Sequence, residues 1–514
     1  MSKIAGIDLG TTFSAISHLN NMGRPDIIAN RDGERIMPSA VFFSPDGRIL
    51  TGEEAIRSRY DDVGRSVRWI KKHMGDAEHK RTIDGKDYTP AELSSLILKK
   101  LHQDASPQVG EITDVVISIP ANFGEVARKA TMDAGKIAGL NVVGIVNEPT
   151  AAAFYYAITH EIQGHVLIFD LGGGTFDVSI ANVAGQDIEI VASSGDSNLG
   201  GYNFDQKLTE FFAQKYKEET GGNLYSDDEE KAEIEDYAEK TKKSLSKKDS
   251  VSYKLKGDSG RVQGTITRSE YDSLISSDLA RIEMLIETAL DEAEDEASDI
   301  DKVLLVGGSS RIPAVQSLLK KMFKYEPSLI GNVDECVSLG AALYAGLRML
   351  EDNPSQVDAG IAAGLSDVKV GDVCNHSYGT LCIAVDEVTQ AEALTNVIII
   401  PKNTAIPCEV NDTFYTRVDG QEKVNTRVTQ GESADPDLIG DPIAEGFLEL
   451  PQGLPPGSPV EIKYSYDKDQ RMTCVFTEPA SGKSKVFDLD LKSGESSERT
   501  IEGQKAKLAD FTIE

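Results

Sequence analysis

The 514-residue chain is poor in the residues that mark secreted, zinc-binding and membrane proteins. Its five cysteines are scattered without C-x-x-C spacing, which indicates reduced thiols in the cytoplasm. Its seven histidines show no H-E-x-x-H or paired-ligand spacing, so the pattern argues against a zinc site. The chain contains no apolar run of about eighteen residues and no charged-then-apolar leader, which argues against a membrane span or a signal peptide.

Positive charge is also scarce. The formal net charge is -31, so nucleic acid and acidic membranes would be repelled at long range, and neither is an expected partner. Hydrophobic residues make up 40% of the chain, and its length allows about two to four domains. The composition therefore predicts a soluble multidomain protein.

Glycine, by contrast, is plentiful, and one glycine-rich turn is informative. The apolar run Val166–Phe169 predicts a buried strand that ends at Asp170, before three glycines and Thr175. Without Cβ atoms, backbone N–H groups can converge on an anion, the threonine hydroxyl adds a donor, and Asp170 can hold a hydrated Mg²⁺. The alternative is a glycine-rich hairpin, because residues 176–180 continue as an alternating strand.

A second copy of this turn lies near the N-terminus, where Asp8 precedes a glycine, two threonines and Phe13. With one glycine inserted, Asp8 aligns with Asp170 and Thr12 with Thr175. A repeat at this separation indicates duplicated domains rather than a short-period solenoid. The two halves are expected to face one nucleotide.

The remaining segments predict an α/β domain followed by an all-β domain. Residues 89–92, Thr-Pro-Ala-Glu, form a strong helix start with a capping threonine, a proline at the first position and a capping-box glutamate. Strands and helices then alternate, which favours a sheet covered by helices. A third glycine turn follows the strand 303–306, at a strand end where open α/β sheets bind ligands. From Thr380 onward, short strands dominate.

Seven ordered segments resemble signatures of the seventy-kilodalton heat-shock chaperones of the DnaK type: IAGIDLGTTFSA, VVISIPANF, DAGKIAGL, NEPTAAA, FDLGGGTFDVS, LGGYNFD and VLLVGGSSRIP. The resemblance is dense from Ile4 to about Leu347 and weaker beyond. It implies an actin-like ATPase domain with two ribonuclease-H-like halves (residues 1–350), a linker (351–373) and a smaller β-sandwich for extended peptide (374–514). It also implies slow ATP hydrolysis in the cytoplasm, with ATP or ADP and Mg²⁺ as cofactors and K⁺ as a further candidate ion.

Carried over position by position, the resemblance assigns a nucleotide site. Lys71 resembles the catalytic lysine whose charge steadies the γ-phosphate, and Glu148 and Asp170 resemble the acids that arrange Mg²⁺ and the attacking water. Asp8 and Asp170 are the expected metal-associated carboxylates, Asp170 acting through water, and Thr175 completes the catalytic set. The other expected nucleotide contacts are Gly10, Thr11, Thr12, Phe13, Gly172, Gly173, Gly174, Asp177, Gly200, Gly201, Glu239, Lys242, Lys243, Ser246, Gly307, Gly308, Ser309, Arg311 and Asp334.

Two of these assignments have plain alternatives. Lys71 with Lys72 and Arg68 would by itself be a surface basic cluster. The four residues taken from 239–246 match the family's adenosine-holding helix and share one helix face, but an ordinary charged surface helix has the same spacing. Lys243 stands where several relatives have arginine, so weaker stacking on adenine is expected.

The resemblance also extends to coupling between the domains. Pro120 and Arg128 match a pair that relays nucleotide state toward the linker, the alternative being a strand-ending proline and a solvent-facing arginine. Asp372 keeps the family's linker acid, but the linker around it is less apolar than leucine-rich linkers, which predicts weak docking. Replacing Lys369 and Gly371 by leucine is therefore expected to strengthen docking.

Peptide contacts and partners follow from the same resemblance. Phe414 and Val424 fall near peptide-cradle positions, although core packing is the alternative for either residue alone. An insertion-like stretch, 386–396, disturbs the alignment at one substrate loop. Expected partners are unfolded or extended polypeptides and a nucleotide-exchange factor. Gly144 replaces an arginine that pairs with J-domain co-chaperones in many relatives, which leaves that partner open.

The chain ends soon after the predicted β domain, so a short form without the family's helical lid is expected. Peptide should then leave quickly in both nucleotide states.

Two competing functions stay open. A metabolite kinase can use the same duplicated fold, although the β domain argues against it. A nucleotide-gated scaffold with one dedicated partner would suit the polar linker.

Overall fold

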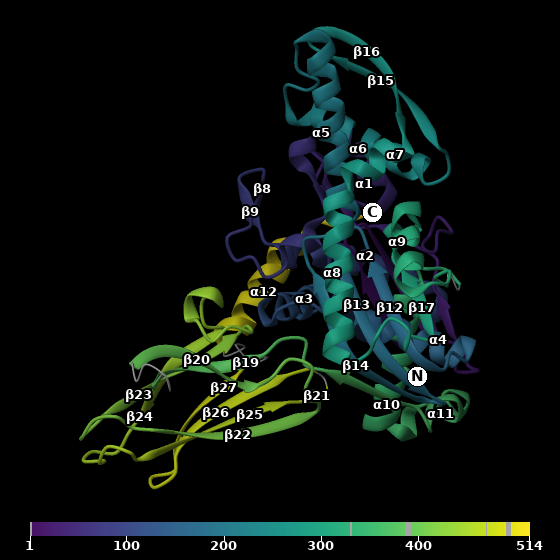
Figure 1. Ribbon diagram of the computed structural model, residues 1–514. Coiled ribbons are helices and arrows are strands. Elements are labelled where there is room, and N and C mark those ends of the chain that lie inside the picture. The colour runs from purple at the N-terminus through teal and green to yellow at the C-terminus, as the bar shows by residue number, and fades with distance from the viewer. Residues whose placement is uncertain (1–2, 329–330, 386–391, 469, 490–494) are drawn as a thin grey trace.

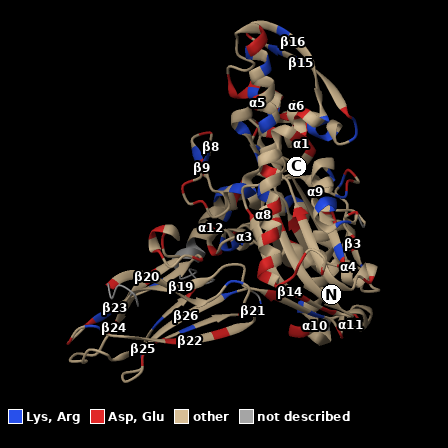
Figure 2. Ribbon diagram, in the orientation of Figure 1, with Lys and Arg blue, Asp and Glu red and all other residues tan. Residues whose placement is uncertain are grey.

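The computed structural model describes residues 3–328, 331–385, 392–468, 470–489 and 495–514, which form a two-lobed α/β domain with a β-sandwich beside it (Figure 1). Among the helices in these ranges, none has both the length and the apolar character needed to cross a membrane. Acidic and basic residues are interspersed along the ribbon in both domains (Figure 2).

The first lobe is built on a six-stranded sheet of order β11-β10-β1-β2-β3, with β4 paired to β2. β1 is parallel to β10 and antiparallel to β2, so the N-terminal glycine turn joins β1 to β2. Alternate residues of β10 face two helical layers: Val115 and Ile117 pack with α2 and α3, and Val116 packs with α4 and α10. The bounds are β1 Lys3–Leu9, β2 Phe13–Leu19, β3 Pro25–Ile27, β4 Met37–Pro38, β10 Ile112–Ile119, β11 Asn141–Asn147, α2 Pro90–Val109, α3 Glu125–Ile137, α4 Glu148–His160 and α10 Cys336–Asp352.

The second lobe repeats this pattern around the FDLGGGTFDVS turn. Its sheet has the order β17-β12-β13-β14-β18-β21, in which β12 is antiparallel to β13 and parallel to β17, as β1 is to β2 and β10. The duplicated turns thus occupy equivalent places in two sheets. The bounds are β12 Gly164–Leu171, β13 Phe176–Ala184, β14 Asp187–Asp196, β17 Lys302–Val306, β18 Lys369–Val373 and β21 Ala405–Ile406.

Smaller elements complete the two lobes. The predicted start of α2 is confirmed, because Glu92 N–H donates to Thr89 Oγ1 at 3.3 Å while Thr89 N–H donates to Glu92 Oε2 at 2.8 Å. The first lobe adds β5 Ala40–Phe43, β6 Arg48–Thr51, α1 Gly52–Ser58, η1 Arg59–Asp61, η2 Val63–Arg65, β7 Ser66–Arg68, η3 Ile70–His73, β8 Arg81–Ile83 and β9 Lys86–Tyr88. The second adds α5 Gly201–Thr220, α6 Asp228–Leu245, β15 Ser250–Gly257, β16 Gly260–Thr267, α7 Arg268–Leu274, α8 Ser276–Ala293, η4 Gly308–Arg311 and α9 Pro313–Phe323.

The sandwich consists of two four-stranded sheets, β20-β19-β23-β24 and β22-β25-β26-β27, with η6 Pro436–Leu438 between strands. Strict alternation in β25 buries Val460, Ile462, Tyr464 and Tyr466 in the shared core. The bounds are β19 Tyr378–Val385, β20 Glu392–Ile400, β22 Cys408–Tyr415, β23 Lys423–Gln430, β24 Ala444–Glu449, β25 Pro459–Tyr466, β26 Met472–Glu478 and β27 Lys483–Asp488. Of the insertion-like stretch, residues 386–391 lie outside the described residues.

The linker lies against the second lobe. After η5 Pro354–Gln356 and the short helix α11 Ala359–Leu365, strand β18 pairs in parallel with β14. Backbone pairing and the buried side chains of Val368 and Val373 hold it there. The expectation of weak docking, based on the low apolar content of the linker, stays a prediction, but the expected gain from leucine at position 369 needs correction. The Lys369 side chain is 81% exposed, so a leucine there would bury little apolar area.

The C-terminal residues do not belong to the sandwich. Helix α12 Glu495–Ala509 packs against α3, and strand β28 Thr512–Ile513 pairs in parallel with β6 in the first lobe (Figure 1). Leu508 and Ile513 are buried in the core of that lobe. The predicted boundary of 374–514 for the sandwich is therefore corrected, because its last twenty residues return to the ATPase-type domain.

This return predicts that Leu508→Ala destabilises the first lobe by about 2–5 kcal/mol, the usual cost of a buried leucine deletion. Urea unfolding followed by fluorescence of Trp69, the single tryptophan, measures this lobe directly. Lys505→Ala is the matched control on the same helix, and its effect should stay within about 0.5 kcal/mol. An unchanged transition for Leu508→Ala would show that α12 adds nothing to the lobe.

Candidate functional site

A cleft of about 690 Å³ lies where the glycine turns of the two lobes meet, a volume suited to a small-molecule ligand. Most of the sequence-predicted site lines it. The predicted lining residues are Asp8, Gly10, Thr11, Thr12, Phe13, Lys71, Glu148, Asp170, Gly172, Gly173, Thr175, Gly201, Glu239, Lys242, Lys243, Ser246, Gly307, Gly308, Ser309, Arg311 and Asp334. Three separate strand-end turns therefore converge on one space.

Three carboxylates surround one lysine on the cleft wall. Lys71 Nζ lies 2.5 Å from Glu148 Oε1, and Asp8 Oδ1 accepts a hydrogen bond from Ser118 Oγ at 3.1 Å. Burial, and then the charge of Glu148, raises the pKa of Asp8 to about 7 and also raises that of Asp170. Burial would lower the pKa of Lys71, but Glu148 and Asp8 raise it above its ordinary value, so the lysine stays charged.

This cluster holds more acid than base. Burial is the main cause of the raised pKa values of Asp8 and Asp170, and repulsion between the carboxylates adds to it. A bound cation would relieve that repulsion. Carboxylate oxygens are hard ligands of the kind Mg²⁺ prefers, usually together with several waters. Asp8 and Asp170, one from each lobe, therefore fit a hydrated Mg²⁺.

The two phosphate-type turns touch each other. A Cβ on Gly173 would lie 1.9 Å from Thr12 Oγ1, so no larger residue fits there without moving the opposite turn. The first N–H groups of α5 close the second turn, with Gly201 donating to the Gly172 carbonyl at 3.0 Å and Tyr202 to the Gly173 carbonyl at 2.7 Å. Close backbone packing of this kind leaves room for phosphate groups but not for extra side chains.

Three predicted contacts do not line the cleft: Gly174, Gly200 and Asp177. A Cβ on Gly200 would lie 2.7 Å from Gly174 N, so these glycines pack against each other behind the turn. The Asp177 carboxylate is buried and accepts a hydrogen bond from Asn122 N at 3.0 Å. Their predicted role is corrected from direct contact to support of the phosphate-type turn.

Helix α6 brings its four predicted residues to the cleft, so here it is not an ordinary solvated helix face. Lys242 Nζ is buried, 2.7 Å from Asp205 Oδ2, and Lys243 Nζ lies 2.7 Å from Glu239 Oε1 with its side chain 60% exposed. Opposite them, Arg311 forms a two-point ion pair with Asp334, at 3.0 and 2.7 Å. Charged pairs therefore border the open part of the cleft.

Nine lining residues were not predicted from the sequence: Ile36, Trp69, Tyr202, Asp205, Lys247, Val306, Gln316, Val333 and Val337. Trp69 is the most informative of them. Its ring lies 4.7 Å from that of Tyr202 and 4.3 Å from the Arg68 guanidinium, and its φ of 56° turns the chain into η3. The sequence signal that could have indicated its place in the cleft is its position, two residues before Lys71.

A second set of contacts joins the lobes to the sandwich. Arg128 is buried, with its guanidinium donating to the backbone carbonyl of Gln470 at 3.2 Å and to its side chain. Asp372 Oδ2 accepts hydrogen bonds from Asn147, Thr150 and Gln470, each at 3.0 Å. The solvent-facing alternative for Arg128 is therefore wrong. Pro120, the third residue of the predicted coupling set, is buried after β10.

The turn before α4 connects the two sites. Glu148 contacts Lys71 in the cleft, while its neighbours Asn147 and Thr150 donate to the linker acid Asp372. Burial raises the pKa of Asp372 to about 6, because its charge has left water for this polar contact. One short turn therefore contacts both the cleft lysine and the linker acid.

Two related lobes around one cleft, joined by a short docked strand to a β-sandwich, define a two-domain α/β protein with a ligand site between its duplicated halves. The model of the family described as Hsp70 protein matches residues 4–504. The chain belongs to the Hsp70 family, as its seven signature segments predicted. Members of this family are in general ATP-dependent chaperones that bind ATP or ADP with Mg²⁺, and they bind unfolded polypeptides and co-chaperones.

The position of Lys71 predicts that Lys71→Ala lowers the rate of ATP hydrolysis by at least about 100-fold, as for loss of other transition-state donors. Affinity for ATP should stay within about tenfold, because the residues bordering the open part of the cleft are unchanged. Single-turnover hydrolysis and equilibrium titration separate the two effects. Lys72→Ala is the matched control, since Lys72 does not line the cleft. Wild-type turnover in Lys71→Ala would remove this lysine from the chemistry.

The contact between the two turns predicts that Gly173→Ala displaces the opposite turn and lowers ATP affinity by at least about tenfold. A loss of about 1.4 kcal/mol of binding free energy is enough for that change. Gly364→Ala is the control, because nothing lies within 4 Å of a Cβ built there. Titration with ATP, alongside circular dichroism to verify folding, measures the difference. Equal affinity in the two variants would show that the turns do not need to touch.

Proposed function

We propose that this chain is an ATP-hydrolysing chaperone in which nucleotide in the cleft controls how the sandwich holds extended polypeptide. The observation that carries the proposal is the turn at Asn147–Thr150, which contacts the catalytic-type lysine on one side and the linker acid on the other. A metabolite kinase would need no such connection to a second domain.

Each residue of the cleft has a proposed task. Lys71 places a positive charge beside the γ-phosphate, and Glu148 and Asp170 orient the attacking water by accepting its hydrogen bonds. Thr175 donates its hydroxyl to the transferred phosphoryl group. Mg²⁺, when bound near Asp8 and Asp170, neutralises charge on the phosphates. The residues of α6 and the Arg311–Asp334 pair hold the adenosine end.

The proposed coupling uses the buried polar contact at Gln470. When nucleotide shifts Glu148, its neighbours change their hold on Asp372, which shares Gln470 with Arg128. Buried polar contacts of this type favour one arrangement strongly, since separating the partners leaves a buried charge unpaired. The domains would then separate as a unit rather than loosen gradually.

Extended polypeptide is proposed to bind on the β19–β20 hairpin. Its cross-strand pair Ile383 and Leu394 is 49% and 46% exposed, and Val385 is exposed beside them. Phe414 and Val424, by contrast, are only partly exposed and pack against the core of the sandwich. The cradle role predicted for them is therefore assigned to the hairpin instead. A nucleotide-exchange factor, and the cytoplasm as location, remain part of the proposal.

Phosphate release with a panel of ligands tests the function. The proposal predicts slow hydrolysis of Mg·ATP that rises with unfolded polypeptide and does not change with sugars. Hydrolysis that depends on a sugar, with phosphate transferred to it, would replace the chaperone by a metabolite kinase. Nucleotide binding without measurable turnover would instead favour the gated scaffold.

Coupling predicts that nucleotide changes peptide affinity by about 1–3 kcal/mol in the wild type, and that Gln470→Ala removes most of this difference. Fluorescence anisotropy of a labelled extended peptide, with ATP and with ADP, measures both proteins. Lys369→Leu is the control because that side chain is exposed, and its difference should match the wild type. A Gln470→Ala protein with an undiminished difference would disprove this route.

The hairpin predicts that Leu394→Asp weakens peptide binding by about tenfold or more, since it removes apolar contact area and adds a charge. Val486→Asp is the matched control, an equally exposed valine on β27 in the other sheet. The same anisotropy assay applies. Equal losses in both variants would place the peptide site elsewhere on the sandwich.

A further inference from the structure

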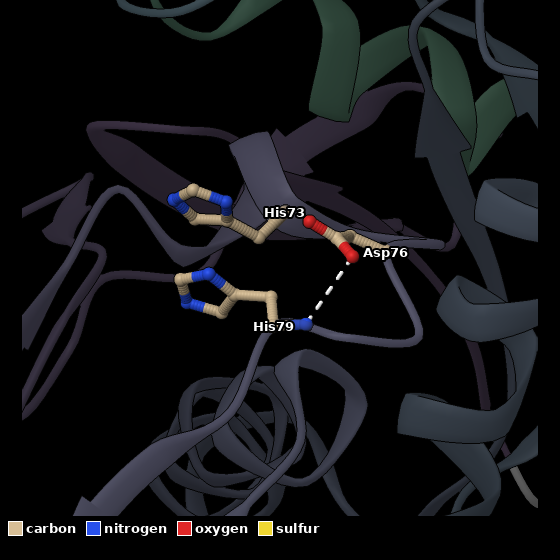
Figure 3. A group of neighbouring side chains, drawn as sticks. All are labelled: His73, Asp76 and His79. Carbon is tan, nitrogen blue, oxygen red and sulfur yellow. Dashed lines mark hydrogen bonds between the residues drawn. The ribbon is translucent and has the colours of Figure 1, made fainter.

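The segment that follows Lys71 carries a second group of ligand-type side chains, outside the nucleotide cleft. His73 ends η3, Asp76 follows the turn at Gly75, and His79 lies three residues further along. Each offers one ligand atom, and these atoms lie within 4.8 Å of one another (Figure 3). Across the described ranges, no other trio of His, Cys, Asp or Glu side chains is gathered in this way.

The backbone turn that gathers these side chains is well defined. Gly75 has a φ of 87°, and Asp76 N–H donates to the His73 carbonyl at 3.0 Å. Asp76 Oδ1 accepts hydrogen bonds from the N–H groups of Glu78 at 3.0 Å and His79 at 3.2 Å. One carboxylate oxygen therefore shapes the loop. The other, Oδ2, has no hydrogen-bond partner within the described residues.

The two imidazole rings are stacked, with centroids 3.6 Å apart and an interplanar angle of 9°. Within the described part of the chain, neither ring has a hydrogen bond to its nitrogens. Figure 3 shows the rings one above the other with the Asp76 carboxylate beside them.

The distances suit a small transition-metal ion. Zinc bonds to nitrogen and oxygen ligands at about 2.0–2.2 Å, so tetrahedral ligand atoms lie about 3.3 Å apart. Imidazole lone pairs lie in the ring plane, so the two parallel rings must rotate out of their stacked arrangement to aim a nitrogen each at one ion and reach that spacing. Two imidazoles and a carboxylate form a ligand set typical of Zn²⁺ with a water in the fourth position, and a poor one for Mg²⁺, which prefers oxygen.

We propose that His73, Asp76 and His79 bind one divalent transition-metal ion of the zinc class. The ion fastens the end of η3 to the loop 76–79. Lys71 belongs to the same 3-10 turn, so the ion stabilises the segment that carries this lysine. The inference goes beyond the proposed function and does not depend on it, because the ligands lie outside the cleft.

Metal titration of the nucleotide-free full chain tests the site. Co²⁺ should develop visible absorption and quench Trp69, which lies four residues before His73, and Zn²⁺ should displace it at one equivalent per chain. Zn²⁺ should also raise the thermal midpoint reported by Trp69. Loss of an outer-shell partner already costs about 10–100-fold in affinity, so loss of a ligand should cost at least about tenfold.

Two variants separate ligation from loop structure. In Asp76→Asn, the amide oxygen can still accept the two loop N–H bonds while the charged ligand oxygen is lost, and His79→Gln removes one imidazole. Both should lose the Co²⁺ signal and the thermal shift. His160→Gln, at an exposed histidine on α4, should keep both.

Asp8→Asn tests whether the ion binds to the cleft carboxylates instead of to His73, Asp76 and His79. This variant should bind Zn²⁺ like the wild type. Wild-type affinity in both Asp76→Asn and His79→Gln would overturn the proposal. Loss of binding in Asp8→Asn alone would overturn it too, since the ion would then sit in the cleft. The absence of any Co²⁺ signal in the wild type would have the same consequence.

Discussion

Burial of three carboxylates around Lys71 is the constraint on which the ATPase-type domain depends. Removing charges from water costs several kcal/mol per ion; Lys71 offsets part of this cost for Asp8, Glu148 and Asp170, and a bound cation would offset more. Each acid comes from a different element: the end of β1, the start of α4 and the end of β12. Two duplicated lobes are the means of bringing them together, because neither sheet alone supplies all three.

The buried charges around Lys71 lie close in the structure to the contact between the ATPase-type domain and the linker. Glu148 and Asn147 are neighbours, but the first points to the nucleotide cleft and the second to the linker. A buried, hydrogen-bonded network has few alternative arrangements, so in the proposed coupling a change at one end would reach the other as a discrete step. The docked strand β18 would provide the mechanical connection, since its backbone pairing with β14 is independent of side-chain size.

Much of this arrangement could be predicted from the sequence, because the signals were local. Glycine runs at strand ends, the capping box at Thr89 and the alternation in β25 each reflect neighbouring residues. The family match then confirmed the resemblance. The three supporting residues, Gly174, Gly200 and Asp177, were misassigned because a motif does not tell which of its members face the ligand.

The features that the sequence did not reveal arise from long-range or backbone contacts. The linker was expected to dock weakly because it is less apolar than leucine-rich linkers, and backbone pairing of β18 with β14, which a side-chain pattern does not reveal, also holds it. The last twenty residues were assigned to the nearest domain in sequence, but Leu508 and Ile513 complete a core whose other members lie mostly within the first 145 residues. The His73–Asp76–His79 cluster does not lie on one helix, since η3 ends at His73, and the turn at Gly75 brings the three side chains together.

The dependence of ATP affinity on Mg²⁺ tests the central claim most directly. Calorimetric titration of ATP into the wild-type chain, with Mg²⁺ and with a chelator, measures it in one experiment. Without Mg²⁺ the buried acids would face the bare phosphates, so ATP affinity is expected to fall by at least about tenfold when Mg²⁺ is removed. Equal affinity in both conditions would contradict it, because the carboxylates around Lys71 would then not be holding a metal-bound phosphate.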